Sequence, residues 1–168
     1  MARLRPLQPD DDAALAGVIR EVMPEFGADR PGTALSDPEV GAMSAAYPGG
    51  RAQYFVVDEE GAVLGGAGFA PLAGSEPDVC ELRKMYLLPQ ARGRGLGRAL
   101  LERCLESAAA AGYRRCYLET LEGMRRARGL YESAGFTALS SPLGCTGHYA
   151  CDTWYARELD PPPPEETP

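Results

Sequence analysis

The architecture of this chain follows from one segment, Glu81-Leu82-Arg83-Lys84-Met85-Tyr86-Leu87-Leu88-Pro89-Gln90-Ala91-Arg92-Gly93-Arg94-Gly95-Leu96-Gly97-Arg98-Ala99-Leu100-Leu101. It predicts a strand that Pro89 ends, then a glycine-rich turn and an amphipathic helix. Such a turn presents several backbone N–H groups and the positive end of the helix to one point, which suits an anion and above all a phosphate. Arg92, Arg94 and Arg98 surround the turn although the formal net charge of the chain is −7, and this local positive charge favours a phosphate ligand.

Three phosphate-binding patterns can be compared with this turn. The pattern G-x-x-x-x-G-K-[ST] fails because the only lysine, Lys84, precedes the turn, and G-x-G-x-x-G fails because its third glycine would fall on Arg98. The pattern Q/R-x-x-G-x-G/A fits at Gln90, Gly93 and Gly95. Two further features accompany this pattern: the preceding strand carries Glu81, and the segment Leu130–Phe136 is similar to L-Y-x-x-x-G-F. With these three features the chain resembles the GNAT superfamily of N-acetyltransferases over roughly residues 2 to 159.

Local patterns predict the order of the secondary structure. We expect strands near residues 3–7, 53–58, 62–72, 79–88, 115–120, 136–138 and 149–159, and helices near 12–23, 37–47, 96–111 and 124–134. The first half indicates antiparallel hairpins, and the alternation of strand and helix in the second half indicates parallel pairing. The resemblance implies an α+β (mixed α/β) fold, with a twisted mixed sheet of about seven strands, splayed central strands and about four flanking helices.

Composition limits the classes of protein to consider. The chain has 168 residues, 45% hydrophobic and 24% charged, which predicts one domain over residues 1–160, and the proline-rich residues 161–168 predict a disordered tail. The acidic balance argues against a nucleic-acid partner. No apolar run approaches the length of a membrane span and the first residues are charged, so we expect a cytoplasmic protein with no membrane partner. Five scattered cysteines do not suggest a disulfide framework.

The resemblance implies that acetyl-CoA is the cosubstrate, without a metal, and that its diphosphate lies on the turn. The residues expected to bind it are Met85, Leu87, Gln90, Arg92, Gly93, Arg94, Gly95, Leu96, Gly97 and Arg98. A bulge before Pro89 would splay the strands and let the N–H of Leu87 meet the thioester carbonyl. Met85 and Tyr86 would flank the pantetheine arm or simply pack in the core. Met124 stands where the family often has an asparagine, which removes one cofactor contact.

Acyl transfer to an amine requires a proton acceptor, because primary amines are mostly protonated near neutral pH. The resemblance implies that Glu81 is the general base, and Glu119 on a neighbouring strand is its rival or part of the acceptor site. The alternative is that Glu81 is a structural glutamate paired with Arg83, Lys84 or another arginine. Tyr131 aligns with the tyrosine that protonates the departing thiolate in many relatives. Its alternative role is that of an aromatic residue packing a helix onto the sheet.

The only histidine lies in the segment Cys145-Thr146-Gly147-His148-Tyr149-Ala150-Cys151-Asp152. The C-x2-H-x2-C spacing superficially suggests zinc, but no second pair of Cys or His residues completes a tetrahedron, so we predict no metal. His148 is expected either to line the acceptor pocket or to sit in a polar hairpin in which the cysteines act as small hydrophobic residues.

These observations predict an N-acetyltransferase in which an amine attacks the thioester directly in a ternary complex. A non-catalytic acyl-CoA sensor and a structural dimer module are the alternatives, and a homodimer is compatible with the sequence. Small amines, peptide N-termini and protein lysines all remain candidate acceptors, because a fold does not identify its substrate.

Overall fold

The structure is a computed structural model that describes residues 1–160, so the predicted tail at 161–168 lies outside the described residues. The strands are β1 (Ala2–Pro6), β2 (Gln53–Glu59), β3 (Ala62–Pro71), β4 (Val79–Leu87), β5 (Arg115–Thr120), β6 (Thr137–Leu139) and β7 (Thr153–Glu158). The α-helices are α1 (Asp12–Val22), α2 (Met43–Ala46), α3 (Leu96–Ala110) and α4 (Arg125–Ser133). Short 3₁₀ turns are η1 (Pro9–Asp11), η2 (Met23–Phe26), η3 (Ala34–Ser36), η4 (Pro38–Gly41) and η5 (Pro89–Ala91).

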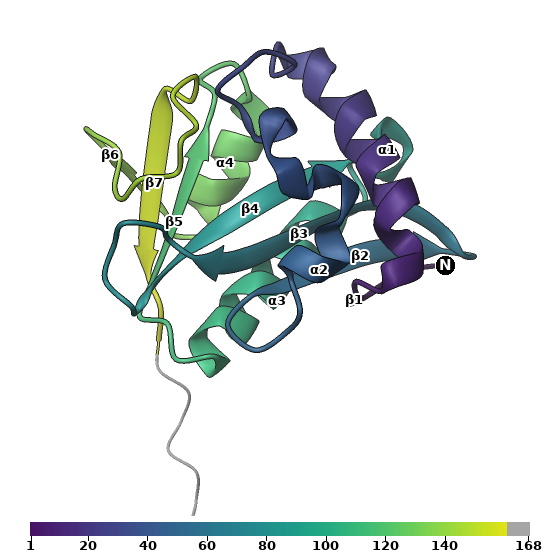
Figure 1. The fold of residues 1–168 in the computed structure, drawn as a ribbon, viewed down its shortest axis with the longest axis horizontal. Helices are drawn as coiled ribbons and strands as arrows, with labels where there is room; N and C mark the ends of the chain where they lie inside the picture. The colour runs from purple at the N-terminus through teal and green to yellow at the C-terminus, as the bar shows by residue number, and fades with distance from the viewer. Residues whose placement is uncertain (161–168) are drawn as a thin grey trace, which may run out of the picture.

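One open, mixed sheet organises the molecule, in the order β1-β2-β3-β4-β5-β7-β6 (Figure 1). The first four strands form antiparallel neighbours, as the sequence predicts. The parallel pairing predicted for the second half is present between β4 and β5, which α3 connects, and among the described strands it is confined to that pair. The cause is β7, which inserts between β5 and β6 and runs antiparallel to both.

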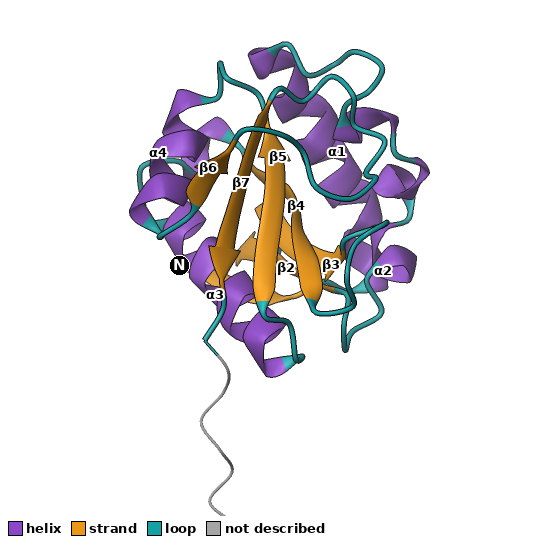
Figure 2. Ribbon diagram, turned by 90° about the vertical axis from the view of Figure 1, so that its left-hand side faces the viewer, coloured by secondary structure: helices purple, strands orange, loops and turns teal. Residues whose placement is uncertain are grey.

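Helices cover both faces of the sheet, with α1 and α2 on one side and α3 and α4 on the other (Figure 2). Successive side chains of a strand point to opposite faces of the sheet, so each strand contributes to the hydrophobic core on both faces. On β2, Phe55 and Val57 pack with the core beneath α3, whereas Tyr54 and Val56 pack with the core beneath α1. This two-layer burial makes α1 and α3 opposite walls of the sheet.

A β-bulge divides β4 into two parts. Opposite it, Gly66 pairs with Tyr86 and Gly68 with Arg83, so β4 carries an extra residue between these pairs. Lys84 lies in this bulge with a φ of 50°. The strands β4 and β5 pair only from Val79 to Glu81 on β4 and then diverge. The splay that the resemblance implied is therefore present, and it opens the middle of the sheet.

The glycines of β3 make room for the aromatic ring that holds the bulge. A Cβ at Gly66 would lie 2.5 Å from Cε1 of Tyr54, so only glycine permits this approach. The buried Tyr54 hydroxyl donates a hydrogen bond of 2.6 Å to the carbonyl of Lys84. The sequence pattern of small residues on β3 therefore fixes the bulge on its neighbour.

Two predicted elements differ from the structure. The helix expected over 37–47 is divided into η4 and α2, because Ala42 leaves helical geometry and the acidic side chains before it turn toward a buried lysine. The last strand begins at Thr153 rather than at residue 149, because the N–H of Ala150 instead bonds the loop carbonyl of Gly32 and that of Cys151 bonds the carbonyl of His148. None of the helices within residues 1–160 combines the length and apolar character of a membrane span.

Candidate active site

The turn between β4 and α3 offers a row of free donors. Gly93 and Gly95 have φ values of 71° and 75°, a backbone geometry that suits glycine, and Gly95 caps the N-terminus of α3. Among the described residues, no hydrogen bond is donated by the backbone N–H groups of residues 93–98, whereas Ala99 already bonds the carbonyl of Gly95. A helix start with unpaired N–H groups carries partial positive charge, so this turn can hold an anion.

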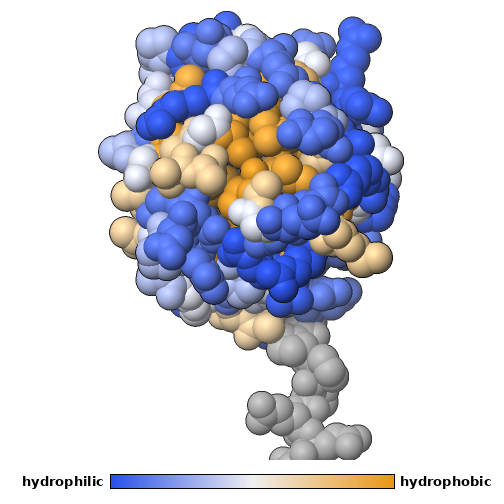
Figure 3. All heavy atoms as spheres, turned by 90° about the vertical axis from the view of Figure 1, so that its right-hand side faces the viewer, coloured by the Kyte–Doolittle hydropathy of each residue, from blue (hydrophilic) through white to orange (hydrophobic). Residues whose placement is uncertain are grey.

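A cleft of about 420 Å³ opens beside this turn. Its lining combines apolar side chains with cationic ones: Val22, Phe26, Met85, Tyr86, Leu87, Met124, Ala127 and Leu130 on one hand, Arg92, Arg98 and Arg126 on the other, with Glu25 and the glycines Gly93, Gly95 and Gly97. The face of the molecule that carries α1 shows an apolar hollow ringed by hydrophilic side chains (Figure 3). A long ligand with an apolar arm and an anionic end matches such a lining.

Arg92 adds a buried donor to the cleft. Its Nε donates to the carbonyl of Leu87 at 2.9 Å and its Nη1 to Glu25 at 2.8 Å. Its Nη2 is, within residues 1–160, the one buried side-chain nitrogen or oxygen atom without a hydrogen-bond partner. A buried orphan donor is costly unless a ligand satisfies it, which supports an anion here.

Most of the residues expected to hold the cofactor meet at this cleft. Met85, Leu87, Arg92, Gly93, Gly95, Gly97 and Arg98 line it. Gln90, Arg94 and Leu96 do not line it, and the guanidinium of Arg94 instead pairs with Glu59 at 2.6 Å. The N–H of Leu96 nevertheless belongs to the row of free donors.

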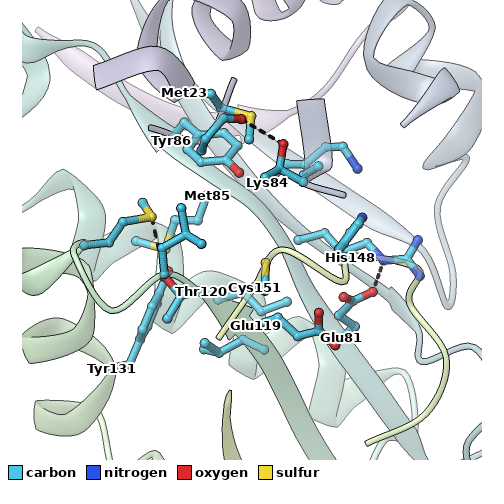
Figure 4. A pocket seen from close by; sticks show the side chains of 18 residues that line it. Met23, Glu81, Lys84, Met85, Tyr86, Glu119, Thr120, Tyr131, His148 and Cys151 are labelled. Atoms are coloured by element: carbon cyan, nitrogen blue, oxygen red, sulfur yellow. Dashed lines mark hydrogen bonds and ion pairs between the residues drawn. The ribbon is translucent and has the colours of Figure 1, made fainter. Parts of the chain in front are cut away.

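A smaller pocket of about 60 Å³ lies at the splay between β4 and β5 (Figure 4). Its lining residues include Glu81, Arg83, Lys84, Leu118, Glu119, Thr120, Tyr131, His148 and Cys151. Met85, Tyr86 and Met124 line both this pocket and the larger cleft. The two spaces therefore adjoin each other at the bulged part of β4.

Glu81 is the most enclosed carboxylate of the smaller pocket, with 4% of its side chain exposed. Its Oε1 accepts a hydrogen bond of 2.5 Å from Nε of Arg83. Burial raises the pKa of Glu81 above its ordinary value, although Arg83 acts in the opposite direction. Among the described residues no hydrogen bond reaches Oε2, and this oxygen is not fully enclosed, so it opens onto the pocket.

Glu119 and Tyr131 line the same pocket, but of the two only the polar side-chain atoms of Glu119 have hydrogen-bond partners within residues 1–160. Both oxygens of Glu119 are occupied, Oε1 by the Tyr117 hydroxyl at 2.8 Å and Oε2 by the Thr146 hydroxyl at 2.9 Å. Tyr131 packs edge-on against Phe136, and burial raises the pKa of its phenol. Within the described residues its hydroxyl has no hydrogen-bond partner and is not fully enclosed. Of these groups, the Tyr131 hydroxyl and Glu81 Oε2 are free to meet a ligand.

Two chain segments meet over the pocket, residues 28–37 and residues 144–152. Nε2 of His148 lies 2.9 and 3.0 Å from the carboxylate oxygens of Asp37, and the N–H of Ala150 donates to the carbonyl of Gly32 at 3.0 Å. His148 thus lines the pocket, as one of its two predicted roles requires. Sequence reasoning missed Asp37, because the partners are separated by 111 positions and no local pattern connects them.

Lys84 extends this network on the side of the segment that contains Asp37 and Glu39, which is called the covering segment below. Its ammonium, with 1% of the side chain exposed, bonds Asp37 at 2.7 Å and Glu39 at 2.5 Å. No group of three or more His, Cys, Asp or Glu side chains within residues 1–160 is arranged to hold a metal ion.

The sequence pattern of the family described as "Acetyltransferase (GNAT) family" matches residues 17–136. Among proteins of known sequence, an uncharacterised N-acetyltransferase of Escherichia coli (strain K12), YjgM, is 45% identical over 158 residues, which cover 93% of this chain and 94% of that protein.

Solved structures show the same fold. A GNAT-family acetyltransferase from Staphylococcus aureus superposes with a TM-score of 0.79 at 16% identity, covering 95% of this chain and all of that one. YncA from Salmonella typhimurium, solved with its cofactor acetyl-CoA, has a TM-score of 0.76 at 23% identity and covers 99% of both chains.

Proposed function

This chain belongs to the acetyltransferase (GNAT) family and is by class an acyltransferase, and we propose that it transfers the acetyl group of acetyl-CoA directly to an amine acceptor in a ternary complex. The observation that carries this proposal is the row of unpaired N–H groups at residues 93–98, which opens onto a cleft of about 420 Å³. That cleft adjoins a second pocket that contains a free carboxylate oxygen.

The residues of the cleft fit coenzyme A. The N–H row and the orphan Nη2 of Arg92 would bind the diphosphate, with Arg98 beside them. The apolar wall that includes Met85, Leu87 and Leu130 suits the pantetheine arm. Its thioester would then lie where the cleft and the smaller pocket adjoin, near the N–H of Leu87.

The smaller pocket would hold the amine. Glu81 is the preferred proton acceptor, because its Oε2 is free and burial makes the carboxylate more basic. Glu119 is less available, because both of its oxygens already accept hydrogen bonds, and it would line the acceptor site together with His148. The free hydroxyl of Tyr131 would protonate the thiolate as the C–S bond breaks.

A screen for thiol release tests this proposal. Wild-type protein is mixed with acetyl-CoA and a panel of amines that includes small amines, amino acids and peptides, and products are identified by mass spectrometry. We expect free thiol and a product heavier by one acetyl group with at least one amine. Heat of acetyl-CoA binding without thiol release would overturn catalysis, and the absence of both would overturn the cofactor site as well.

The Glu81–Arg83 ion pair favours a second candidate, a non-catalytic sensor of acyl-CoA. A carboxylate held by a guanidinium is a weaker proton acceptor than a free one. A sensor would bind acetyl-CoA through the same N–H row and release no thiol with any amine, so the same screen separates the two functions.

A further inference from the structure

The most enclosed carboxylate of the acceptor pocket has little contact with solvent through which to release its proton. Glu81 lies beneath the covering segments, with 4% of its side chain exposed. Acetylation of an ammonium group releases one net proton, which has to leave the pocket before the next turnover. His148 lines the same pocket (Figure 4), and 13% of its side chain is exposed, so the imidazole contacts both the pocket and solvent.

The contacts of His148 determine which of its nitrogens can accept that proton. Burial alone would raise the pKa of Asp37, but hydrogen bonds from His148 and Lys84 outweigh burial and keep that pKa below its ordinary value. Asp37 is therefore ionised near neutral pH and can only accept hydrogen bonds. Nε2 of His148, 2.9 Å away, must carry a proton, which leaves Nδ1 of the neutral ring as the proton acceptor.

The charges around His148 tune its basicity in both directions. The hydrogen bond to Asp37 raises the pKa of His148 most, burial lowers it, the nearby charge of Glu81 raises it and that of Lys84 lowers it, with a net increase. Glu119 contacts the same segment through Thr146. The ordinary pKa of an imidazole is about 6.5 and that of a glutamate about 4.3, and their surroundings raise both here. The imidazole is therefore by its ordinary value the stronger base of the two.

We infer that the Asp37–His148 pair is a second proton acceptor of the acceptor pocket, which takes the proton that Glu81 removes from the acceptor ammonium and delivers it to solvent. This inference rests on the proposed function. One ammonium N–H bond breaks and, after transfer through Glu81, an Nδ1–H bond forms. The amine attacks the thioester, the C–S bond breaks, the thiolate takes a proton from Tyr131, and the second amine proton restores the phenol. The net products are the amide, free coenzyme A and one proton.

Nuclear magnetic resonance tests the geometry without turnover. His148 is the only histidine, so an untagged, ¹⁵N-labelled protein has a single imidazole to observe. We expect the neutral ring to carry its proton on Nε2, and the imidazole pKa to fall in Asp37→Asn. A neutral ring protonated on Nδ1, or an imidazole pKa that Asp37→Asn leaves unchanged, would overturn the inference.

Kinetics tests the role in proton transfer. His148→Gln keeps a donor that can reach Asp37 but removes the basic nitrogen, so kcat should fall by about 10- to 100-fold at neutral pH, at or below the lower end of general acid–base effects. The acid limb of the kcat/KM profile should shift, while the Kd for acetyl-CoA stays unchanged. Because both groups act on one proton, adding His148→Gln to Glu81→Gln should cost little more. Ser141→Ala, exposed in the same loop, is the matched control and should behave as the wild type.

The outcomes separate the inference from the function on which it rests. A His148→Gln protein with the wild-type kcat and the wild-type acid limb would overturn the relay and leave the acetyltransferase standing. Losses that multiply in the double variant would also overturn it, because they would indicate independent roles. A wild-type protein that releases no thiol with any amine would overturn the proposed function and the relay together.

Discussion

At the scale of single residues, Glu81 is subject to opposing influences. Burial makes its carboxylate more basic than an exposed glutamate, while Arg83 holds one oxygen and makes it less basic, with a net rise in pKa. The ionised fraction of Glu81 therefore increases with pH over a range above the ordinary glutamate pKa of about 4.3. If Glu81 is the base, the rate must rise with pH over the same range.

Glu81→Gln tests this assignment, with Glu119→Gln as the matched variant. We expect Glu81→Gln to lower kcat by about 10²- to 10³-fold at neutral pH, and by less at high pH, where the free amine no longer needs a base. The acid limb of kcat/KM should also lose the step that belongs to Glu81. Glu119→Gln should have the smaller effect, because Glu119 already accepts two hydrogen bonds. The reverse order of the two losses, measured by thiol release, would assign the base to Glu119.

Tyr131 allows a separate test of the departing thiolate. Its ring packs against Phe136 and Tyr155, whereas its hydroxyl has no partner among the described residues. Tyr131→Phe keeps the ring and should leave the thermal midpoint of unfolding nearly unchanged. It should lower kcat by about 100-fold if the phenol protonates the thiolate. Normal kcat with a normal Kd for acetyl-CoA would leave Tyr131 as a packing residue.

At the scale of elements, the proposed binding of acetyl-CoA by the turn before α3 rests on the unpaired backbone N–H groups of residues 93–98. A side chain at Gly95 meets no atom within 4 Å, so the cost of Gly95→Ala lies in its φ of 75° rather than in crowding. That strain is of the order of 1 to 2 kcal/mol, and relief of it would turn N–H groups away from the anion. Charge-assisted hydrogen bonds contribute about 1.5 to 3 kcal/mol each, so the Kd for acetyl-CoA should rise by about 10- to 100-fold.

Gly129→Ala is the matched control for that substitution. Gly129 lies in α4, has open space around it and has no positive φ, so alanine should stabilise the helix by about 0.5 to 1 kcal/mol. Titration calorimetry should therefore separate the two variants, with weaker acetyl-CoA binding in Gly95→Ala alone. Equal affinity in both variants would contradict a role for the N–H row.

The elements also show which features the sequence could predict. The strand, turn and helix from Val79 to Ala110 follow local rules, namely alternation, Pro89 as a stop and glycine at the turn, so their positions were predictable. The helix expected over 37–47 was wrong because Asp37 and Glu39 bind Lys84, which lies 47 and 45 positions away, and no local periodicity reports such partners. The resemblance and the motifs predicted that Glu81, Tyr131 and His148 lie near one pocket. They did not reveal the pairing of His148 with Asp37, because no local periodicity reports this distant partner either.

At the scale of the whole molecule, Lys84 connects the two layers that form the smaller pocket, the proposed acceptor site. It projects from the bulge in β4 and binds the segment that passes between η3 and α2, so the sheet and its covering segment share one buried ammonium group. Burial alone would raise the pKa values of Asp37 and Glu39. Their hydrogen bonds and ion pairs outweigh burial and hold both pKa values below the ordinary range, and Lys84 is the partner that both carboxylates share. Stability from these groups is therefore fully present above the ordinary carboxyl pKa of about 4 and is lost as pH falls through the lower, folded-state values.

Lys84→Met tests this connection. The variant leaves Asp37 and Glu39 without their shared buried cation, which should lower the free energy of unfolding by about 3 to 5 kcal/mol at neutral pH. The loss should become smaller as pH falls toward about 4, because the carboxylates then protonate and no longer need the cation. Arg115→Met, which breaks the exposed pair with Glu158, should change stability by about 1 kcal/mol or less at either pH. Urea unfolding followed by circular dichroism measures the free energy of unfolding of the wild type and of both variants. If the stability lost in Lys84→Met does not depend on pH, packing of the lysine stem, rather than its charge, joins the covering segment to the sheet.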